Sequence, residues 1–304
     1  MTAADVVSPR VQPRWLAFVR AMRVHQWVKN LLLFVPVILD HKLFDGETIT
    51  KAGLGFIAFC CAASGGYILN DILDLEADRR HATKRHRPFA SGALPPVLGL
   101  ALTPVLIIVA MWISWLFLPP HFVAAVVFYL VLTTAYSVYL KRIAVLDVLL
   151  LAGLYTLRVL AGVAAAHVRF STWLLAFSMF LFLSLAFLKR YAEISGLEPA
   201  AGDQIHRRGY LRGDREWLGS MGSSSGYLSV LVLALYINSD QVVALYRTPL
   251  LLWLVCPLLL LWIGRMWLMA YRGQIHEDPI VATVRDPLSY LLGALVGVIM
   301  YAAL

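Results

Sequence analysis

The sequence predicts an all-α protein that crosses a membrane several times, and three observations support this fold class. First, 60% of the 304 residues are hydrophobic and only 14% are charged, with a mean hydropathy of +0.74. A soluble domain has about 25% charged residues and cannot bury so much apolar surface. Second, apolar stretches of membrane-spanning length recur along the chain. Third, the basic residues are concentrated in alternate gaps between those stretches.

Nine apolar stretches approach or exceed the length of a membrane helix, which is about 20 residues. They cover residues 30–46, 50–69, 94–117, 121–140, 144–166, 171–189, 219–238, 248–270 and 287–304. Asp40 and His41 interrupt the first stretch, and the amphipathic segment 15–29 before it is expected to be an interfacial helix. Residues 1–14 are expected to be flexible, and residues 15–304 to form a single nine-helix transmembrane domain.

The distribution of Lys and Arg predicts the orientation in the membrane. If the N-terminus is cytoplasmic, 21 of the 26 basic residues lie on the cytoplasmic side, 4 lie on the other side, and Arg158 lies within the fifth span. An even number of spans would break this bias. The net charge of +8 therefore mostly reflects membrane orientation, and nucleic acid is a poor partner for so apolar a chain. The first 29 residues lack the pattern of a cleavable signal peptide.

The strongest functional pattern is the acidic segment 70–78, where the second span is expected to reach the cytoplasm. At about 100° per residue, Asn70, Asp74 and Asp78 share one helix face, and Asp71 lies at its edge. Carboxylates this close repel one another unless a cation lies among them. Hard oxygen ligands suit Mg²⁺ that also holds a substrate diphosphate. We therefore expect all four residues to be Mg²⁺ ligands and the three aspartates to be catalytic. A solvated helix end is the alternative.

Five basic residues follow the acidic segment within residues 79–87, among them Arg79, Lys84 and Arg87. Guanidinium and ammonium groups suit phosphate oxygens. Beside the acidic face, this basic segment is expected to complete a diphosphate-binding site. Ordinary cytoplasmic positive charge is the alternative.

The pattern Asn70-Asp71-x-x-Asp74-x-x-x-Asp78, followed by Lys84-x-x-Arg87-Pro88-x-x-x-Gly92, resembles the first aspartate-rich motif of the UbiA superfamily of intramembrane prenyltransferases. The resemblance implies nine transmembrane helices around a central cavity whose cytoplasmic end is capped by charged loops. Ordinary members join an isoprenyl diphosphate to an aromatic acceptor. They also carry a second motif, Asp-x-x-x-Asp, after the sixth span.

This chain departs from the second motif, because it reads Lys189-Arg190-Tyr191-Ala192-Glu193 there. That string is similar to the polyprenyl-phosphate phosphoribosyltransferase branch, as are segment 23–30 and the string His276-Glu277-Asp278-Pro279. The resemblance implies Mg²⁺-dependent transfer of 5-phosphoribose from phosphoribosyl diphosphate to a polyprenyl phosphate, such as a decaprenyl phosphate, in the bacterial inner membrane. Prenyl transfer to an aromatic acceptor remains the alternative. A transporter is less well supported, because the acids gather at one rim.

The resemblance and the charge pattern together mark one set of candidate substrate-binding residues. They are Lys29, Asn30, Arg79, Lys84, Arg87, Lys141, Arg158, Lys189, Arg190, Tyr191 and Glu193. Arg158 is expected either to contact a substrate phosphate or to pair with an acid from another span. Lys29 with Asn30 is expected to hold the lipid phosphate or to anchor the helix at the interface. Asp278 is expected either to add a ligand or to close its loop.

Overall fold

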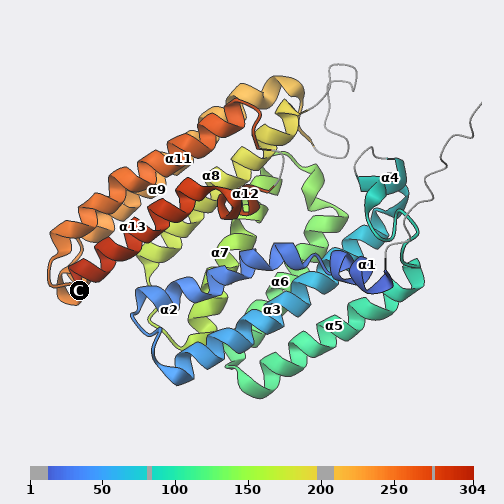
Figure 1. The fold of residues 1–304 in the computed structure, drawn as a ribbon, viewed down its shortest axis with the longest axis horizontal. Helices are drawn as coiled ribbons and strands as arrows, with labels where there is room; N and C mark the ends of the chain where they lie inside the picture. The colour runs from blue at the N-terminus through green and yellow to red at the C-terminus, as the bar shows by residue number, and fades with distance from the viewer. Residues whose placement is uncertain (1–12, 81–83, 197–208, 276–277) are drawn as a thin grey trace, which may run out of the picture.

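The computed structural model describes residues 13–80, 84–196, 209–275 and 278–304, and every regular element in these ranges is a helix (Figure 1). Seven helical segments in this part of the chain are long and apolar enough to cross a membrane. They are α3 (Gly46–Leu73), α5 (Pro96–Phe117), α6 (Pro120–Val138), α7 (Leu146–Ala166), α8 (Thr172–Ser195), α9 (Arg215–Ile237) with its lead-in η5 (Arg212–Asp214), and α11 (Val255–Tyr271) with its lead-in η6 (Pro249–Leu254). The helices α12 (Pro279–Arg285) and α13 (Pro287–Ala303) form one further segment, which is bent by 83°.

Shorter helices fill the connections between the long ones. Near the start of the chain, α1 (Arg14–Ala21) is followed by the 3₁₀ helix η1 (Val24–Phe34), which continues into α2 (Val35–Leu39). The others are α4 (Leu75–Arg80), η2 (Lys84–His86), η3 (Leu140–Arg142) and α10 (Asp240–Leu245). The prediction of a flexible terminus over residues 1–14 falls mostly outside the described residues, and α1 already begins at Arg14.

Each of the nine predicted spans corresponds to helix, but two of them are not straight helices of full length. The first was expected over residues 30–46, whereas the apolar helical segment runs from Val24 to Leu39. His41 then adopts a left-handed φ of 54°, so the helix cannot continue toward residue 46. The last, predicted over residues 287–304, corresponds to α13, which has 17 residues and is long enough to span a membrane only together with α12. The described residues therefore contain seven full-length spans, or eight with the bent pair, and the all-α fold class is confirmed.

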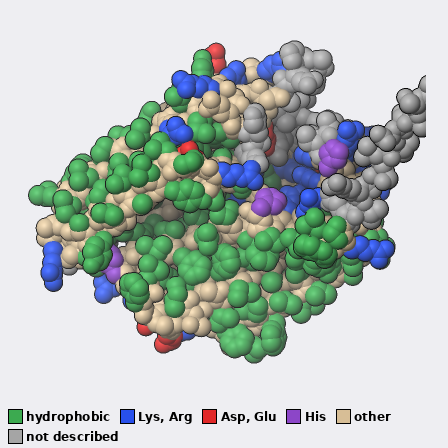
Figure 2. Space-filling model, in the orientation of Figure 1, with side chains coloured by type: hydrophobic (Ala, Val, Ile, Leu, Met, Phe, Trp, Pro, Cys, Tyr) green, Lys and Arg blue, Asp and Glu red, His purple; other side chains and the backbone are tan. Residues whose placement is uncertain are grey.

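Two groups of helices lie on either side of α6 and α7 (Figure 1). One group contains α2, α3 and α5, and the other contains α8, α9, α11 and α13. The most apolar stretch of α7 is 61% buried, against 17% for α6 and 22% for α5. Helix α7 therefore lies inside the bundle, while the outer helices present apolar side chains to the surroundings, as membrane helices do. Figure 2 shows hydrophobic side chains over much of one face, with Lys, Arg and His side chains gathered around a hollow.

A close helix crossing brings η1 against α7. A Cβ atom on Gly162 would lie 2.1 Å from the carbonyl oxygen of Leu33, so only glycine allows this approach. The crossing brings the polar residues Lys29 and Asn30 of η1 next to Arg158 of α7, inside a bundle that is otherwise apolar.

Candidate active site

The acidic segment lies at a break between two helices. Helix α3 ends at Leu73, Asp74 caps it, and α4 begins at Leu75. The single continuous helix face expected for this segment is therefore interrupted at Asp74. Its backbone N–H still donates to the Asn70 carbonyl at 2.9 Å, but its carboxylate turns to Lys141 of η3, with a contact of 2.8 Å. Aspartate is a weak helix former, which makes such a break inexpensive.

Asp71 and Asp78 converge on one guanidinium. The Nη1 atom of Arg87 lies 3.0 Å from Asp71 and 2.6 Å from Asp78. Asp71, which is only 2% exposed, also accepts a hydrogen bond of 2.5 Å from Arg23. The site therefore compensates its carboxylates with nearby cations. We call Asn70, Asp71, Asp74, Asp78, Arg87 and Lys141 the acidic rim.

The four expected metal ligands are not gathered around one point. Among the described residues, no three His, Cys, Asp or Glu side chains are grouped closely enough to hold a metal ion. Asp71 and Asp78 point to Arg87, whereas Asp74 points to Lys141. The donor chemistry still fits Mg²⁺, because hard carboxylate oxygens from two residues meet on one positively charged nitrogen. The ligand role of these residues stays a prediction.

The basic residues after the acidic segment divide into two kinds. Arg87 reaches the acids, as described above. Arg79 is about half exposed and lies 3.8 Å from Glu76 on the outside of α4, and Lys84 is exposed. The contacts in the structure therefore support a place in the site for Arg87, and the roles of Arg79 and Lys84 stay predictions.

A second charged group lies around Asp278, which immediately precedes α12. Its Oδ2 atom contacts Lys29 of η1 at 2.7 Å and Lys189 of α8 at 3.1 Å. The hydroxyl of Tyr155, from α7, lies 3.1 Å from both carboxylate oxygens. Although burial favours the neutral acid, Lys189 and Lys29 hold the pKa of Asp278 well below its usual range. We call Lys29, Tyr155, Lys189 and Asp278 the Asp278 cluster.

Arg158 extends this cluster into the bundle. Its guanidinium donates to Asn30 Oδ1 at 2.9 Å, to the Leu154 carbonyl at 2.6 Å and to the Tyr129 hydroxyl at 3.1 Å. All three partners are neutral. The predicted pairing with an acid is therefore not found among these contacts. Since Lys29 and Lys189 share a single carboxylate among the described residues, the cluster together with Arg158 holds an excess of positive charge.

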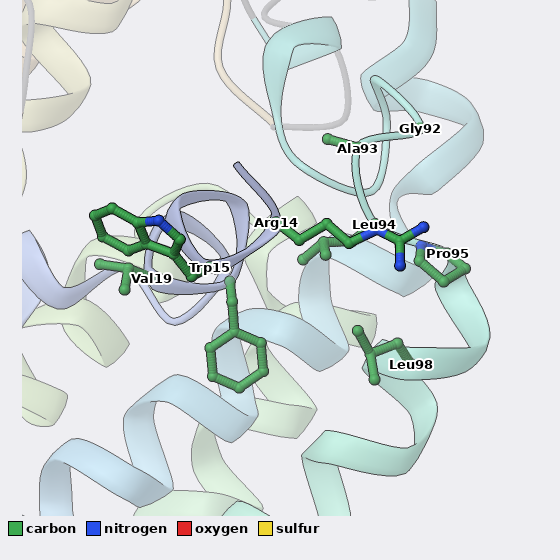
Figure 3. A pocket seen from close by; sticks show the side chains of 9 residues that line it. Arg14, Trp15, Val19, Gly92, Ala93, Leu94, Pro95 and Leu98 are labelled. Atoms are coloured by element: carbon green, nitrogen blue, oxygen red, sulfur yellow. The ribbon is translucent and has the colours of Figure 1, made fainter. Parts of the chain in front are cut away.

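A cavity of about 390 Å³ borders the Asp278 cluster and is lined by His25, Gln26, Asp278 and Arg285. A larger cavity of about 600 Å³ lies elsewhere, between α1 and the start of α5 (Figure 3). It is lined mainly by apolar side chains such as Phe18 and Leu98, and it contains none of the predicted site residues. The smaller cavity is therefore the better candidate for substrate access.

Arg190, Tyr191 and Glu193 lie outside the Asp278 cluster, although their neighbour Lys189 belongs to it. The Arg190 guanidinium is fully buried and contacts Asp147 of α7, Glu193 at 2.5 Å and the Tyr136 hydroxyl at 2.8 Å. Tyr191 is buried beneath Arg215, whose guanidinium lies 5.0 Å from the ring centre. Adjacent helix positions point about 100° apart, so a helix that turns Lys189 inward turns Arg190 toward α7. These contacts favour a structural role over the expected substrate contact.

Two members of the site were not predicted from the sequence, and the role of a third was left open. Arg23 contacts Asp71, and Tyr155 contacts Asp278. One signal was present: Tyr155 precedes Arg158 by three residues and so shares its helix face. Asp278 had been weighed only as a ligand or a loop contact. The residues 276 and 277 before it lie outside the described part of the chain.

Taken together, the fold and the site define a polytopic helical membrane protein with an acidic rim and a buried basic cluster. A model of the UbiA prenyltransferase family matches residues 41–282. The chain belongs to that family.

Three curated relatives share much of the sequence. "Uncharacterized protein y4nM" of Sinorhizobium fredii is 39% identical over 93% of this chain and 54% of its own length. "Nodulation protein NoeC" of Azorhizobium caulinodans is 34% identical over 94% of this chain and 93% of its own. The "Decaprenyl-phosphate phosphoribosyltransferase" of Corynebacterium glutamicum is 36% identical over 68% of this chain and 63% of its own. The chain thus spans less than two thirds of the first and third of these relatives.

Solved structures share the fold at low sequence identity. A UbiA homolog from Archaeoglobus fulgidus bound to GPP and Mg²⁺ superposes with a TM-score of 0.70 at 14% identity, covering 94% of this chain and 99% of the other. A digeranylgeranylglyceryl phosphate synthase gives a TM-score of 0.64 at 16% identity, covering 95% and 96%. These similarities establish the UbiA-type helical architecture.

Proposed function

We propose that the protein transfers 5-phosphoribose from phosphoribosyl diphosphate to a polyprenyl phosphate in a Mg²⁺-dependent reaction that releases diphosphate. The observation that carries this proposal is the excess of positive charge at Lys29, Lys189 and Arg158, which would form a second anion site separate from the acidic rim. A buried charge without a carboxylate partner is costly unless a ligand supplies the opposite charge. The similarity to relatives named decaprenyl-phosphate phosphoribosyltransferases supports the same choice.

The acidic rim is the proposed site of the diphosphate. Asn70, Asp71, Asp74 and Asp78 would hold Mg²⁺, which supplies positive charge to the departing diphosphate. Arg87 and Lys141 contact these carboxylates. Because the two cations lie beside the proposed metal ligands, they would bind the outer oxygens of the diphosphate. The Archaeoglobus homolog with GPP and Mg²⁺ supports a divalent metal in this fold.

The proposed reaction breaks the bond between ribose C1 and the diphosphate oxygen, and it forms a bond between C1 and an oxygen of the lipid phosphate. Positive charge develops at C1 as the diphosphate leaves, and the metal that the rim would hold would stabilise the negative charge of the departing diphosphate. The attacking phosphate oxygen is already ionised near neutral pH, so the reaction needs no strong general base. Lys29 and Lys189 would hold a phosphate group of the reacting substrates.

The orientation follows from the same proposal. The rim and the N-terminus would face the cytoplasm of a bacterial inner membrane, where phosphoribosyl diphosphate is available and where the basic residues concentrate. The lipid acceptor would enter from the bilayer.

Prenyl transfer to an aromatic acceptor is the second candidate, and the family assignment itself favours it. In that reaction the acidic rim would bind an isoprenyl diphosphate, and the buried cations would face the acceptor. The two candidates therefore differ in the donor and the acceptor, and both use the acidic rim.

A product assay on purified protein in lipid separates the two candidates. One reaction receives labelled phosphoribosyl diphosphate with a polyprenyl phosphate, and the other receives a labelled isoprenyl diphosphate with an aromatic acid, both with Mg²⁺. We expect lipid-soluble product in the first reaction, its loss in Asp74→Asn, and unchanged turnover in the control Arg247→Gln, whose side chain is exposed and distant in sequence from the site. Product in the second reaction alone would refute the phosphoribosyl proposal.

A further inference from the structure

Asp278 links the smaller cavity to two lysines, Lys29 and Lys189. The cavity is lined by Asp278, His25, Gln26 and Arg285. Lys29 and Lys189 do not line it, yet both contact Asp278 Oδ2. An anion in this cavity therefore lies next to Asp278, the residue that pairs with both lysines.

When both lysines are protonated, their two positive charges exceed the single charge of the carboxylate, although burial lowers the pKa of Lys29 to about 7. Two ammonium groups share one carboxylate, and their side chains are only 9% and 26% exposed. A phosphate monoester carries close to two negative charges above its second pKa of about 6. It would match both lysines, and it offers three acceptor oxygens to them and to the Tyr155 hydroxyl. A carboxylate offers one charge and two oxygens.

We propose that the Asp278 carboxylate occupies the position that a phosphate of the substrate takes when it binds. Lys29, Lys189 and Tyr155 form a phosphate-monoester subsite, and the incoming phosphate displaces the Asp278 carboxylate from it. This inference rests on the proposed function, because it takes the buried cations to be a phosphate site. It adds that Asp278 pairs with Lys29 and Lys189 until the substrate binds.

The attachment of Asp278 suits such a movement. It precedes α12, a helix of seven residues that meets α13 at an angle of 83°. The Asp278 carboxylate also accepts a hydrogen bond of 3.2 Å from the Ile280 backbone N–H. Asparagine caps helices as well as aspartate does. Asp278→Asn therefore removes the negative charge and keeps the local hydrogen bond, which makes it a matched test variant.

The first test measures binding of two soluble phosphate monoesters, ribose 5-phosphate and geranyl phosphate, to full-length protein in discs of neutral lipid without phosphoribosyl diphosphate. Removing a competing ion pair should tighten binding of at least one probe by about tenfold in Asp278→Asn. Adding Lys189→Gln should abolish the gain. A gain for ribose 5-phosphate assigns the subsite to the sugar phosphate, and a gain for geranyl phosphate assigns it to the lipid phosphate. No gain for either probe overturns the inference.

The second test detects the displacement itself. An environment-sensitive fluorophore is attached through Val284→Cys on α12, a position that is 39% exposed. Binding of the phosphate monoester should shift the emission of the fluorophore in the otherwise wild-type protein. The Asp278→Asn protein should show the shifted emission without any phosphate monoester. Binding with no emission change would show that Asp278 stays in place, which contradicts displacement. These two readouts do not require turnover. The subsite inference can therefore fail while the transfer assay succeeds, and the transfer assay can fail while the subsite inference holds.

Discussion

Replacing Arg190 by methionine should destabilise the protein far more than replacing its neighbour Lys189. Arg190 is fully buried, and its guanidinium neutralises Asp147, which is also fully buried. Its loss would leave the Asp147 carboxylate with the Tyr210 hydroxyl, which donates to it at 2.7 Å. Breaking a buried ion pair by removing one partner costs about 3–5 kcal/mol. We expect a loss of unfolding free energy in this range for Arg190→Met.

A double variant provides the matched control. Arg190→Met combined with Asp147→Leu removes both charges, and such apolar replacements are often neutral or stabilising. The double variant still loses the hydrogen bonds of Asp147 with Tyr210 and of Arg190 with Tyr136 and Glu193, each worth about 1 kcal/mol. Lys189→Met removes one of two cations from Asp278 and leaves Lys29 in contact with that carboxylate. Lys189→Met should therefore keep most of the stability and lose substrate affinity.

The assay compares unfolding free energies of the four proteins under reversible conditions in detergent, together with substrate KM. The expected order of stability is wild type first, then Lys189→Met, then the double variant, and Arg190→Met lowest. If Arg190→Met unfolds like wild type but has a raised KM, Arg190 binds substrate and the structural role assigned here is wrong.

Three further predictions concern the crossing, the Asp278 cluster and the rim. Gly162→Ala places a Cβ 2.1 Å from the Leu33 carbonyl, so it should cost about 1–3 kcal/mol of unfolding free energy; unchanged stability would contradict the close crossing. The pKa of Asp278 lies below its usual value, so its stabilisation holds at neutral pH and is lost as pH falls below about 4. Wild type should lose stability more steeply there than Asp278→Asn, and parallel slopes would count against the cluster. Asp74→Asn should fold normally and lose Mg²⁺-dependent turnover, and full turnover would remove Asp74 from the mechanism.

The helical fold was predictable because the length of each apolar stretch can be read directly from consecutive residues of the sequence. Helices α5 and α7 match their predicted stretches within a few residues. The first span was less predictable, since a 3₁₀ segment and the left-handed His41 depend on how η1 crosses α7. The break at Asp74 was also missed, because its cause includes an ion pair with Lys141, 67 residues away in the sequence.

The site was predictable in its residue types and less so in its pairings. The acidic segment correctly drew attention to Asp71, Asp74 and Asp78, but their cations come from distant segments. Lys29 and Asp278 are 249 positions apart in the sequence and meet only in the folded bundle. Lys189 and Arg190 are neighbouring basic residues, and the sequence does not distinguish their roles. Because they point in different directions from α8, Lys189 contacts Asp278 and Arg190 contacts Asp147.

The most direct test of the central claim follows two labels on phosphoribosyl diphosphate, one on the 5-phosphate and one on the β-phosphate. Purified protein in lipid receives this donor with a polyprenyl phosphate and Mg²⁺. If the protein transfers phosphoribose, the 5-phosphate label enters the lipid phase and the β-phosphate label stays in water as diphosphate. If neither label enters the lipid phase while an isoprenyl diphosphate is consumed with an aromatic acceptor, phosphoribosyl transfer is contradicted.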